Sequence, residues 1–388
     1  MKLENLIKIT SGYPFPSSEL VSNNNGTPVI KIKELKSKTV VFSNDTNFYC
    51  GDKALEEYCV TQGDILVAMT GNPPTKPNLD AMVGRCSRYP YSFTSLLNQR
   101  ICKVESKSPL LLTKYLYYWL SRDGMTEFLA QSSKGSANQA NISNRDILSL
   151  EIDLVSVAQQ SHIVDILGSI DDSIENNEKI IEVLEEKMLL EYDRLITSTA
   201  LAESEMQEIF DISIGKTPPR KESHWFTEKS EDVKWLSISD MGKAKVFAFD
   251  SSEKITAEGI EKYNVKIAPE NTVLLSFKLT IGKVAITGCE MATNEAIAHF
   301  VSDDENIVEY LYCYLKRYNF DMLGNTSSIA TAVNSKTIKA MKFYYPDKET
   351  LADFHSTTEP LIKKIKHLLI TNAKLNKLKQ LYLKKFFG

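Results

Sequence analysis

A long heptad pattern in the middle of the chain constrains the fold more than any other feature. Residues 159–196 contain no proline, and their apolar side chains recur at alternating spacings of four and three residues. This spacing is typical of a coiled-coil helix, because it keeps one apolar seam facing a partner. The pattern predicts a straight helix roughly 50 Å long; the competing interpretation, an ordinary amphipathic core helix, rarely keeps this period over such a length. The seam positions are Ile163, Leu167, Ile170, Ile174, Asn177, Ile181, Leu184, Met188, Glu191 and Leu195.

A second stretch, residues 354–387, repeats the pattern with the opposite charge. Residues 159–196 hold ten acidic and three basic side chains, a net charge of −7, whereas residues 361–388 hold eight lysines and no acid. Opposite charges attract and like helices repel, so we expect the two stretches to pair within one chain, with the lysines facing the acids rather than phosphate. An antiparallel alignment sets Asn177 opposite Asn372, and a buried Asn pair is a device that fixes register. The second seam is Phe354, Thr358, Leu361, Ile365, Leu368, Asn372, Leu375, Lys379, Tyr382 and Phe386.

The segments outside these stretches form an internal repeat. Six short matches occur in the same order in both halves, for example Tyr115–Leu120 (YLYYWL) with Tyr310–Leu315 (YLYCYL). Each half has short β-branched runs bounded by Gly, Pro and Asn, then one amphipathic helix, near 110–130 and 305–322, and a polar loop. The sequence therefore predicts an α+β fold with pseudo-twofold symmetry, in which two similar mixed α+β domains are joined by two long antiparallel helices that form an intramolecular coiled coil. The predicted boundaries are 1–155 for the first domain, 156–200 for the first spacer helix, 201–347 for the second domain and 348–388 for the second spacer helix.

Composition narrows the class of protein. The chain has no run of 18 apolar residues and no apolar signal at its start, so we expect neither a membrane span nor secretion. The six cysteines are scattered without a C-x-x-C pair, which disfavours a metal cluster or disulfide framework and fits a reducing cytoplasm. No H-x-x-x-H pair and no G-x-x-x-x-G-K-[ST] loop occur, so no metal or nucleotide site is expected. The net charge of −4 does not by itself indicate a nucleic-acid binder, but the acidic helix alone contributes −7.

Residues of the second domain resemble a known family. The matching segments are Ile214–Pro219 (IGKTPP), His224-Trp225, Trp235–Ile238 (WLSI), Lys254–Thr256 (KIT), Gly259-Ile260 and Ile281–Lys283 after Leu274–Phe277. Together with a closing loop, a final strand and the helix that carries Asp171, Ile174, Asn177 and Leu184, they resemble the target recognition domain of the specificity subunit of type I restriction–modification systems. The resemblance covers essentially the whole chain, and the first domain matches more loosely, at Ser11–Pro16.

The resemblance implies a DNA-reading scaffold that performs no catalysis. Each domain would read one half of a bipartite double-stranded DNA target, while the coiled coil would set the spacer and dock two methyltransferase subunits, joined in the full complex by restriction subunits. The methyl donor and ATP would bind those partners, so no cofactor is implied for this chain. The alternative function is a non-DNA scaffold that presents two protein-binding globules on a coiled coil.

One short motif points to methyltransferase chemistry, and we interpret it as structural. Asn72–Thr75 (NPPT) is similar to the N-P-P-F/Y motif of adenine methyltransferases, in which an aromatic ring stacks on a flipped base. Here threonine stands in the aromatic position and no Gly-rich loop precedes the motif, so a rigid turn is the better interpretation.

The candidate DNA contacts lie in the polar loops, because lysines suit phosphate and amide side chains can pair with base edges. Taken singly, each such residue is more often plain solvent-facing surface, so the prediction concerns the group. In the first domain the candidates are Thr70, Asn72, Lys76, Gln99, Arg100, Lys134, Asn138, Gln139 and Asn141. In the second domain they are Lys216, Thr217, Arg220, Lys221, Lys278, Thr280, Lys283, Asn325, Thr326 and Ser327.

Overall fold

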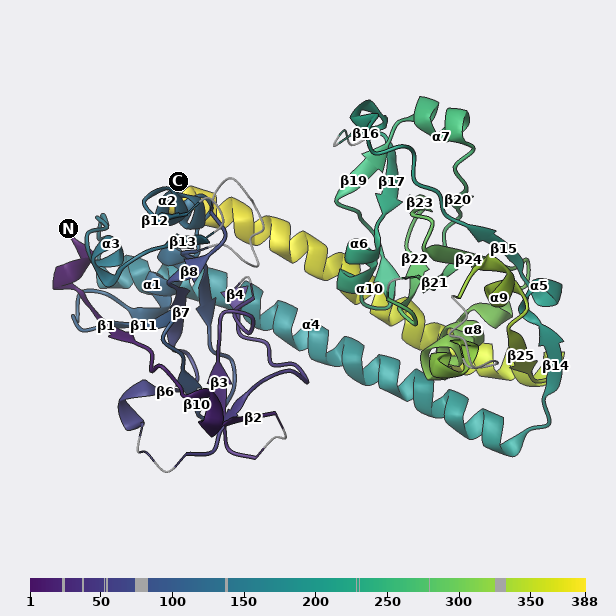
Figure 1. The fold of residues 1–388 in the computed structure, drawn as a ribbon, viewed down its shortest axis with the longest axis horizontal. Helices are drawn as coiled ribbons and strands as arrows, with labels where there is room; N and C mark the ends of the chain where they lie inside the picture. Colours follow the sequence, from purple (N-terminus) through teal and green to yellow (C-terminus); the bar gives the residue numbers. More distant parts are fainter. Residues whose placement is uncertain are drawn as a thin grey trace. The chain divides into compact units, whose positions relative to one another are not determined.

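The computed structural model describes residues 1–22, 25–36, 38–51, 53, 55–73, 83–136, 139–227, 229, 231–278, 280–324 and 333–388. The chain divides into two compact units, the first formed by Met1–Ser173 with Leu375–Gly388 and the second by Ile174–Lys374. Each unit contains part of both long helices, α4 (Val157–Ser198) and α10 (Lys348–Phe387) (Figure 1).

The first unit is built around two mixed sheets and a small third sheet. The strand orders are β1-β11-β7-β9-β4, β2-β5-β3-β10-β6 and β12-β13-β8. The strands are β1 Ile7–Ser11, β2 Leu20–Val21, β3 Thr27–Ile30, β4 Lys38–Thr39, β5 Phe48–Tyr49, β6 Cys59–Val60, β7 Ile65–Ala68, β8 Thr70–Gly71, β9 Cys86–Arg88, β10 Ser95–Leu97, β11 Ile101–Ser106, β12 Lys134–Ser136 and β13 Gln139–Asn141. The helices are α1 Thr113–Leu120, α2 Met125–Gln131 and α3 Asn144–Leu148, with 3₁₀ turns at Leu3–Asn5, Ser17–Glu19 and Glu56–Tyr58.

The two large sheets of the second unit have the same topology as those of the first. They have the orders β15-β24-β21-β22-β18 and β16-β19-β17-β23-β20, and β14 pairs with β25. The strands are β14 Ala202–Glu205, β15 Asp211–Ile214, β16 Phe226–Thr227, β17 Val233–Leu236, β18 Phe247–Ala248, β19 Glu253–Ile255, β20 Ile267–Ala268, β21 Val273–Ser276, β22 Val284–Thr287, β23 Met291–Thr293, β24 Ile297–Val301 and β25 Lys342–Tyr345. The helices are α5 Met206–Ile209, α6 Ile238–Lys243, α7 Ala257–Tyr263, α8 Val308–Arg317 and α9 Ser335–Lys339, with 3₁₀ turns at Ser223–Trp225, Glu305–Ile307 and Phe320–Gly324.

Parallel pairs fall at equivalent places in the two units. Strand β3 is parallel to β10 and β4 to β9 in the first unit, as β17 is to β23 and β18 to β22 in the second. Equal strand orders with equal polarity are strong evidence of a duplicated fold. The prediction of two similar mixed α+β domains is therefore confirmed.

Tyrosines on α1 and α8 fasten the globular part of each unit to α4. The hydroxyl of Tyr118 donates to Oδ2 of Asp171 at 2.8 Å, and that of Tyr312 donates to Oε1 of Glu185 at 2.7 Å. Both rings are buried in the core of their own unit, so each hydroxyl finds its partner at the helix surface. The repeated tyrosine-rich motif thus combines core packing with a polar attachment to the long helix.

Helices α4 and α10 run antiparallel in each unit, as predicted (Figure 1). In the first unit, Leu167 of α4 and Leu383 of α10 are buried in one apolar cluster. In the second unit, Ile181 and Ile365 share another, and Nδ2 of Asn177 donates to Oδ1 of Asn372 at 2.7 Å. The aligned heptads place these two asparagines opposite each other, and the structure has them hydrogen-bonded.

The charges on the two helices have other partners than the sequence suggests. Among the described residues, one ion pair joins α4 to α10, between Lys379, which is 3% exposed, and Asp171. Other acids of α4 pair with bases of the second unit's globular part: Lys245 with Glu178 and Glu182, Lys316 with Glu185, and Arg317 with Glu186 and Asp193. The expectation that the lysines of α10 face the acids of α4 is therefore wrong for most of them, because those acids are turned toward their own globule.

The helix expected near residues 110–130 is interrupted. Helix α1 ends at Leu120 and α2 begins at Met125, after Gly124, whose φ of +78° lies in the left-handed region that glycine adopts easily. The resulting bend gives α2 a direction of its own.

Candidate nucleic-acid interface

A glycine holds the loop after the first strand of each unit against a second turn. A Cβ built on Gly12 would lie 2.1 Å from the carbonyl oxygen of Asn98, and one built on Gly215 would lie 2.2 Å from that of Asn294. These distances leave no room for a side chain, so the close approach requires glycine at both positions. The loops after β1 and β15 therefore lie beside residues 98–100 and 294–296.

In the first unit, the backbone of Met69 brings three candidate segments to one edge. Its N–H donates to the carbonyl of Arg100, and its carbonyl accepts from the N–H of Ile142, both at 2.9 Å. Strand β13 also pairs with β8, so Asn141 lies opposite Thr70. Segments that are 30 to 70 residues apart in the sequence thus meet at one place.

The exposed side chains at this edge are amides and an arginine. The side chains of Gln99, Arg100, Gln139 and Asn141 are exposed, and Asn72 is half-buried. Thr70 is buried, and its hydroxyl donates to Oδ1 of Asn141 at 2.8 Å. Thr70 is therefore placed to orient Asn141 rather than to contact a ligand itself.

In the second unit, the loop after β15 is fixed at several points. The hydroxyl of Thr217 donates to Glu295, and Nε1 of Trp235 donates to the carbonyl of Lys216 at 3.1 Å. The side chains of Lys216 and Lys221 remain exposed. The loop thus offers two lysines on a backbone that neighbouring side chains hold in place.

Arg220 of this loop is not a free cation. Its guanidinium carbon lies 4.0 Å from the ring centre of Phe226 and 4.6 Å from that of Trp235, and its Nη1 is 2.7 Å from Oε1 of Glu253. A guanidinium stacked on aromatic rings and paired with a carboxylate keeps a fixed orientation. Any ligand of Arg220 would have to share it with Glu253.

The candidate loop after β21 joins the same edge. The N–H of Phe277 donates to the carbonyl of Ala296 at 2.9 Å, which places the loop beside the turn at residues 294–296. Lys278 and Thr280 are exposed, whereas Lys283 is half-buried, with its Nζ 3.5 Å from the carbonyl of Ile238. Lys283 is therefore the least accessible lysine among the candidates of this unit whose side chains the structure describes.

Six of the predicted candidates have side chains outside what the structure describes. Lys134 lies in β12, and its side chain is outside what the structure describes. Lys76, Asn138, Asn325, Thr326 and Ser327 lie outside the described residues.

A buried histidine lies beneath the edge of the second unit. His299 of β24 is fully buried, with Nε2 2.7 Å from Oγ1 of Thr293 and Nδ1 3.1 Å from Oγ of Ser213. Burial lowers the pKa of His299 to about 4, so the ring is neutral at neutral pH. Its hydrogen bonds tie β15 to the end of β23, just before the turn at residues 294–296.

Two polar residues at these edges, Glu295 and Lys53, are not among the candidates predicted from the sequence. Glu295 holds Thr217, and it occupies the position that Gln99 has in the first repeat, so the aligned pair Asn98-Gln99 and Asn294-Glu295 contained the signal. Lys53 lies 4.5 Å from the ring centre of Tyr13 and donates to its hydroxyl at 3.2 Å, beside the loop after β1. Lys53 stands in an unremarkable sequence, and only the fold reveals its place.

Neither a membrane-spanning helix nor a metal-binding cluster is found among the described residues. No helix among them is long and apolar enough to cross a membrane. No group of three or more His, Cys, Asp and Glu side chains among them could hold a metal ion.

Comparisons with known proteins agree with the duplicated fold. Residues 1–186 and 201–380 match the family described as "Type I restriction modification DNA specificity domain". The specificity subunit of the type I restriction enzyme HindI from Haemophilus influenzae is 26% identical over 182 residues, which cover 46% of this chain and 39% of that protein. The specificity subunit of EcoBI from Escherichia coli is 25% identical over 188 residues, covering 47% of this chain and 35% of that protein. The matched region thus spans well under half the length of these curated relatives.

A solved structure shares the fold over the full chain. The S subunit of a type I restriction–modification system from M. genitalium aligns with a TM-score of 0.59 at 16% identity, covering 100% of this chain and 95% of that one. Since the family match takes in both repeats, with their edge loops and most of both long helices, the chain belongs to the family of type I restriction–modification DNA specificity domains.

Proposed function

We propose that this chain is the DNA sequence-specificity subunit of a type I restriction–modification enzyme. Each domain reads one half of a bipartite double-stranded DNA target, and the coiled coil sets the spacer between the halves. The observation that carries the proposal is the repeated strand order, which presents a polar loop edge in each unit. Two similar reading surfaces on one chain suit a target with two half-sites.

Within this proposal, the domains are residues 1–155 and 201–347, and the spacer helices are 156–200 and 348–388. The chain itself performs no catalysis and binds no cofactor. Its partners are two methyltransferase subunits, which dock on the coiled coil, and restriction subunits in the full complex. Since its substrate is genomic DNA, the complex acts in the cytoplasm.

The exposed residues at each edge divide into two roles. Gln139 and Asn141 can form paired hydrogen bonds with adenine, and Arg100 with guanine, so these side chains read base edges. Lys216, Lys221 and Lys278 carry mobile point charges, which suit phosphate and fix the register of the domain on the duplex. The other candidates hold these side chains in position or provide further DNA contacts from the same loops.

Exchange of one domain tests the proposal. Residues 1–155 are replaced by the corresponding domain of another family member, the variant is expressed with its methyltransferase subunits, and methylated adenines are mapped across the host genome. The expected result is a change in one half of the recognised sequence, with the other half and the spacer retained. The reciprocal exchange of residues 201–347 should change the opposite half.

A change in both halves after either exchange would contradict the assignment of one half to each domain. If the wild-type chain with its methyltransferase subunits showed no sequence-selective DNA binding, the non-DNA scaffold would be the better explanation.

A further inference from the structure

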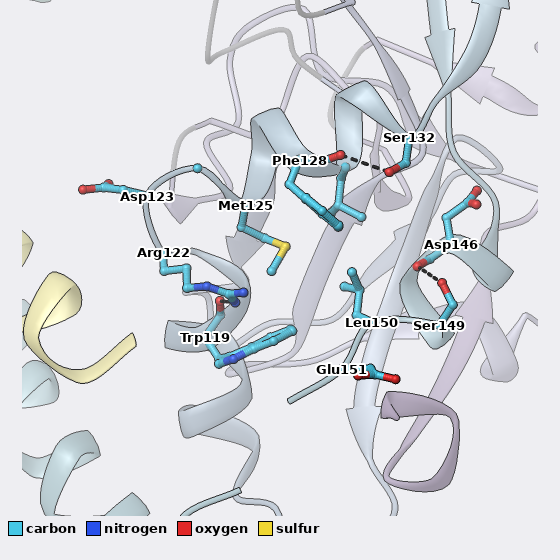
Figure 2. A pocket seen from close by; sticks show the side chains of 12 residues that line it. Trp119, Arg122, Asp123, Met125, Phe128, Ser132, Asp146, Ser149, Leu150 and Glu151 are labelled. Atoms are coloured by element: carbon cyan, nitrogen blue, oxygen red, sulfur yellow. Dashed lines mark hydrogen bonds between the residues drawn. The ribbon is translucent and has the colours of Figure 1, made fainter. Parts of the chain in front are cut away.

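A cavity in the first unit lies between α2 and the end of α3. Its volume is about 570 Å³. Figure 2 shows that Met125 and Phe128 point into it from α2, and Leu150 from the segment after α3. The lining also includes Trp119, Arg122, Asp123, Leu129, Asp146 and Glu151.

The floor of this cavity is apolar, and its outer wall is an exposed aromatic ring. Met125 and Leu129 are 3% and 1% exposed, whereas Phe128 is 54% exposed. A phenylalanine left in water beside an open cavity with an apolar floor is the arrangement of a protein-binding pocket, because filling the cavity would cover the ring as well.

The charged group in the cavity wall is Arg122. Its guanidinium carbon lies 3.9 Å from the ring centre of Trp119, and Nη1 donates to the carbonyl of the same residue at 2.6 Å. Burial lowers the pKa of Arg122, and among the described residues no carboxylate is paired with it. A half-buried guanidinium that still has free N–H groups is a ready site for a carboxylate.

The acidic side chains near the cavity leave this cation facing inward. The carboxylate of Asp146 accepts hydrogen bonds from the N–H and the hydroxyl of Ser143, both at 2.7 Å, and caps α3. Figure 2 shows the carboxylates of Asp123 and Asp146 pointing away from the centre of the cavity. The exposed Glu151 also lines the cavity, so the positive charge offered to a ligand is local to Arg122, beside Trp119.

The second unit shows what its equivalent arginine does. Alignment of YLYYWL with YLYCYL matches Arg122 to Arg317. Arg317 is 2.8 Å from Asp193 and 3.5 Å from Glu186, both of which belong to α4. In the second unit the chain itself supplies the carboxylates, whereas in the first unit Arg122 keeps an open cavity in front of it.

We propose that this cavity is a docking site for a partner polypeptide that inserts an apolar side chain and places a neighbouring carboxylate on Arg122. The inference rests on the proposed function, in which that partner is a methyltransferase subunit. A phosphodiester would satisfy the guanidinium but would gain nothing from Trp119, Met125 and Phe128, so the lining favours protein over DNA.

A partner bound in this cavity would affect DNA recognition, because the cavity-lining segments flank strands β12 and β13 in the sequence. Ser132, two residues before β12, and Asp146, five residues after β13, both line the cavity. Strand β13 carries Gln139 and Asn141. A partner that fills the cavity would therefore contact the segments that flank both strands and restrict the motion of these side chains.

Binding measurements on the full chain test the proposal. The methyltransferase subunit is titrated onto wild type, Arg122→Glu, Arg122→Lys and Phe128→Ser, with Lys114→Glu as the matched control. Lys114 is an exposed base on α1 outside the cavity, so its reversal makes the same charge change elsewhere. Arg122→Glu and Phe128→Ser should weaken binding by about tenfold or more, Arg122→Lys by less, and Lys114→Glu should have no effect.

A crosslinking experiment identifies the occupant even if Arg122→Glu folds poorly. A photoreactive phenylalanine analogue replaces Phe128, and in a control chain it replaces Phe93, an exposed aromatic residue of the same unit that does not line the cavity. The expected product joins position 128, but not 93, to a methyltransferase peptide with an apolar residue beside Asp or Glu. A crosslink to DNA, or unchanged affinity in Arg122→Glu and Phe128→Ser, would overturn the proposal.

Mapping of methylated sites, at methyltransferase concentrations that saturate each variant, separates this inference from the proposed function. If the wild-type complex methylates no defined bipartite sequence, the proposed function fails. If it does so and the cavity variants bind normally, the docking site alone is wrong.

Discussion

At the scale of single residues, several side chains that look like free ligands in the sequence are held by neighbours. Arg220 is stacked and paired with Glu253, and Thr217 is bound to Glu295. Thr70 is buried beneath Asn141. Such contacts fix the direction of the groups that remain exposed, and a fixed group loses less conformational entropy on binding. In the proposed function, DNA readout at these edges therefore depends on supporting residues as much as on contacting ones.

Gly215→Ala should damage reading by the second domain alone. The new Cβ would lie 2.2 Å from the carbonyl oxygen of Asn294, so the loop after β15 must move, at a cost of about 1–3 kcal/mol in the free energy of unfolding. Mapped methylation sites should then show lost discrimination in one half of the target. Gly168→Ala is the matched control, because its nearest neighbour is 3.9 Å away, and both halves should be kept. Equal effects of the two substitutions would contradict this account.

His299 should make the protein less stable in acid. In the folded state its pKa is about 4, whereas an unfolded histidine titrates near 6.5, so below pH 6.5 the unfolded chain binds a proton that the folded chain does not. The free energy of unfolding should fall by about 3 kcal/mol between pH 6.5 and 4 on this account. Urea unfolding followed by tryptophan fluorescence should show a flatter pH dependence in His299→Gln. An unchanged slope would assign the effect to other groups.

At the scale of elements, the long helices organise both units. Helix α4 receives Tyr118 of α1 on Asp171 and Tyr312 of α8 on Glu185, and α10 completes each apolar cluster. The polar pair Asn177–Asn372 interrupts a mostly apolar seam. A polar pair in a seam costs stability but disfavours shifted alignments, in which an amide would face an apolar side chain.

Replacing one or both of these asparagines should show that the pair lowers the stability of the coiled coil although it fixes the register. Asn177→Leu alone removes the hydrogen bond that the side chain of Asn372 accepts. Because Asn372 is only 7% exposed, the loss should lower the free energy of unfolding by about 1–3 kcal/mol. The double variant Asn177→Leu with Asn372→Leu removes both polar groups and should be more stable than the single variant in urea unfolding. If the double variant were no more stable than the single variant, the two amides would contribute more to the free energy of unfolding than this one hydrogen bond.

The features of the fold that could be predicted from the sequence are those that depend on residues close together in the chain. The heptad period and the repeated motifs are local patterns, so the long helices and the duplicated domains could be read from the sequence. Strands such as β5 (Phe48–Tyr49) are too short to show a period, and the partners of Lys316 and Arg317 depend on long-range packing. Of the candidate site, the loops could be named, but which side chains are free could not. Arg220 and Thr70 show why, since their contacts come from other strands.

At the scale of the whole molecule, the proposed function ties the length of the coiled coil to the spacing of the DNA half-sites. One heptad adds about 10 Å to a helix, which equals about three base pairs and turns the next half-site onto another face of the duplex. Three heptads add about 31 Å, close to one turn of B-DNA, and keep both half-sites on the same face.

Matched insertions in α4 and α10 should therefore behave periodically. Three heptads added to both helices should yield methylation of the same two half-sites with a spacer about nine or ten base pairs longer. One heptad added to both should abolish recognition of the two half-sites together while leaving the helices paired, as circular dichroism would show. Recognition with an unchanged spacer after the longer insertion would contradict a coil that sets the spacing.

The division of the chain into units has a consequence for its synthesis. The first unit consists of Met1–Ser173 with Leu375–Gly388, so the ribosome delivers its missing helical segment only after the entire second unit has been made. Until then the apolar face of α4 around Ile163 and Leu167 has no cover from Tyr382 and Leu383. Domains generally fold in order as they emerge, but here the earlier one must wait for the later one. A nascent chain that stalls near its end would therefore expose an aggregation-prone apolar surface in the half that was translated first.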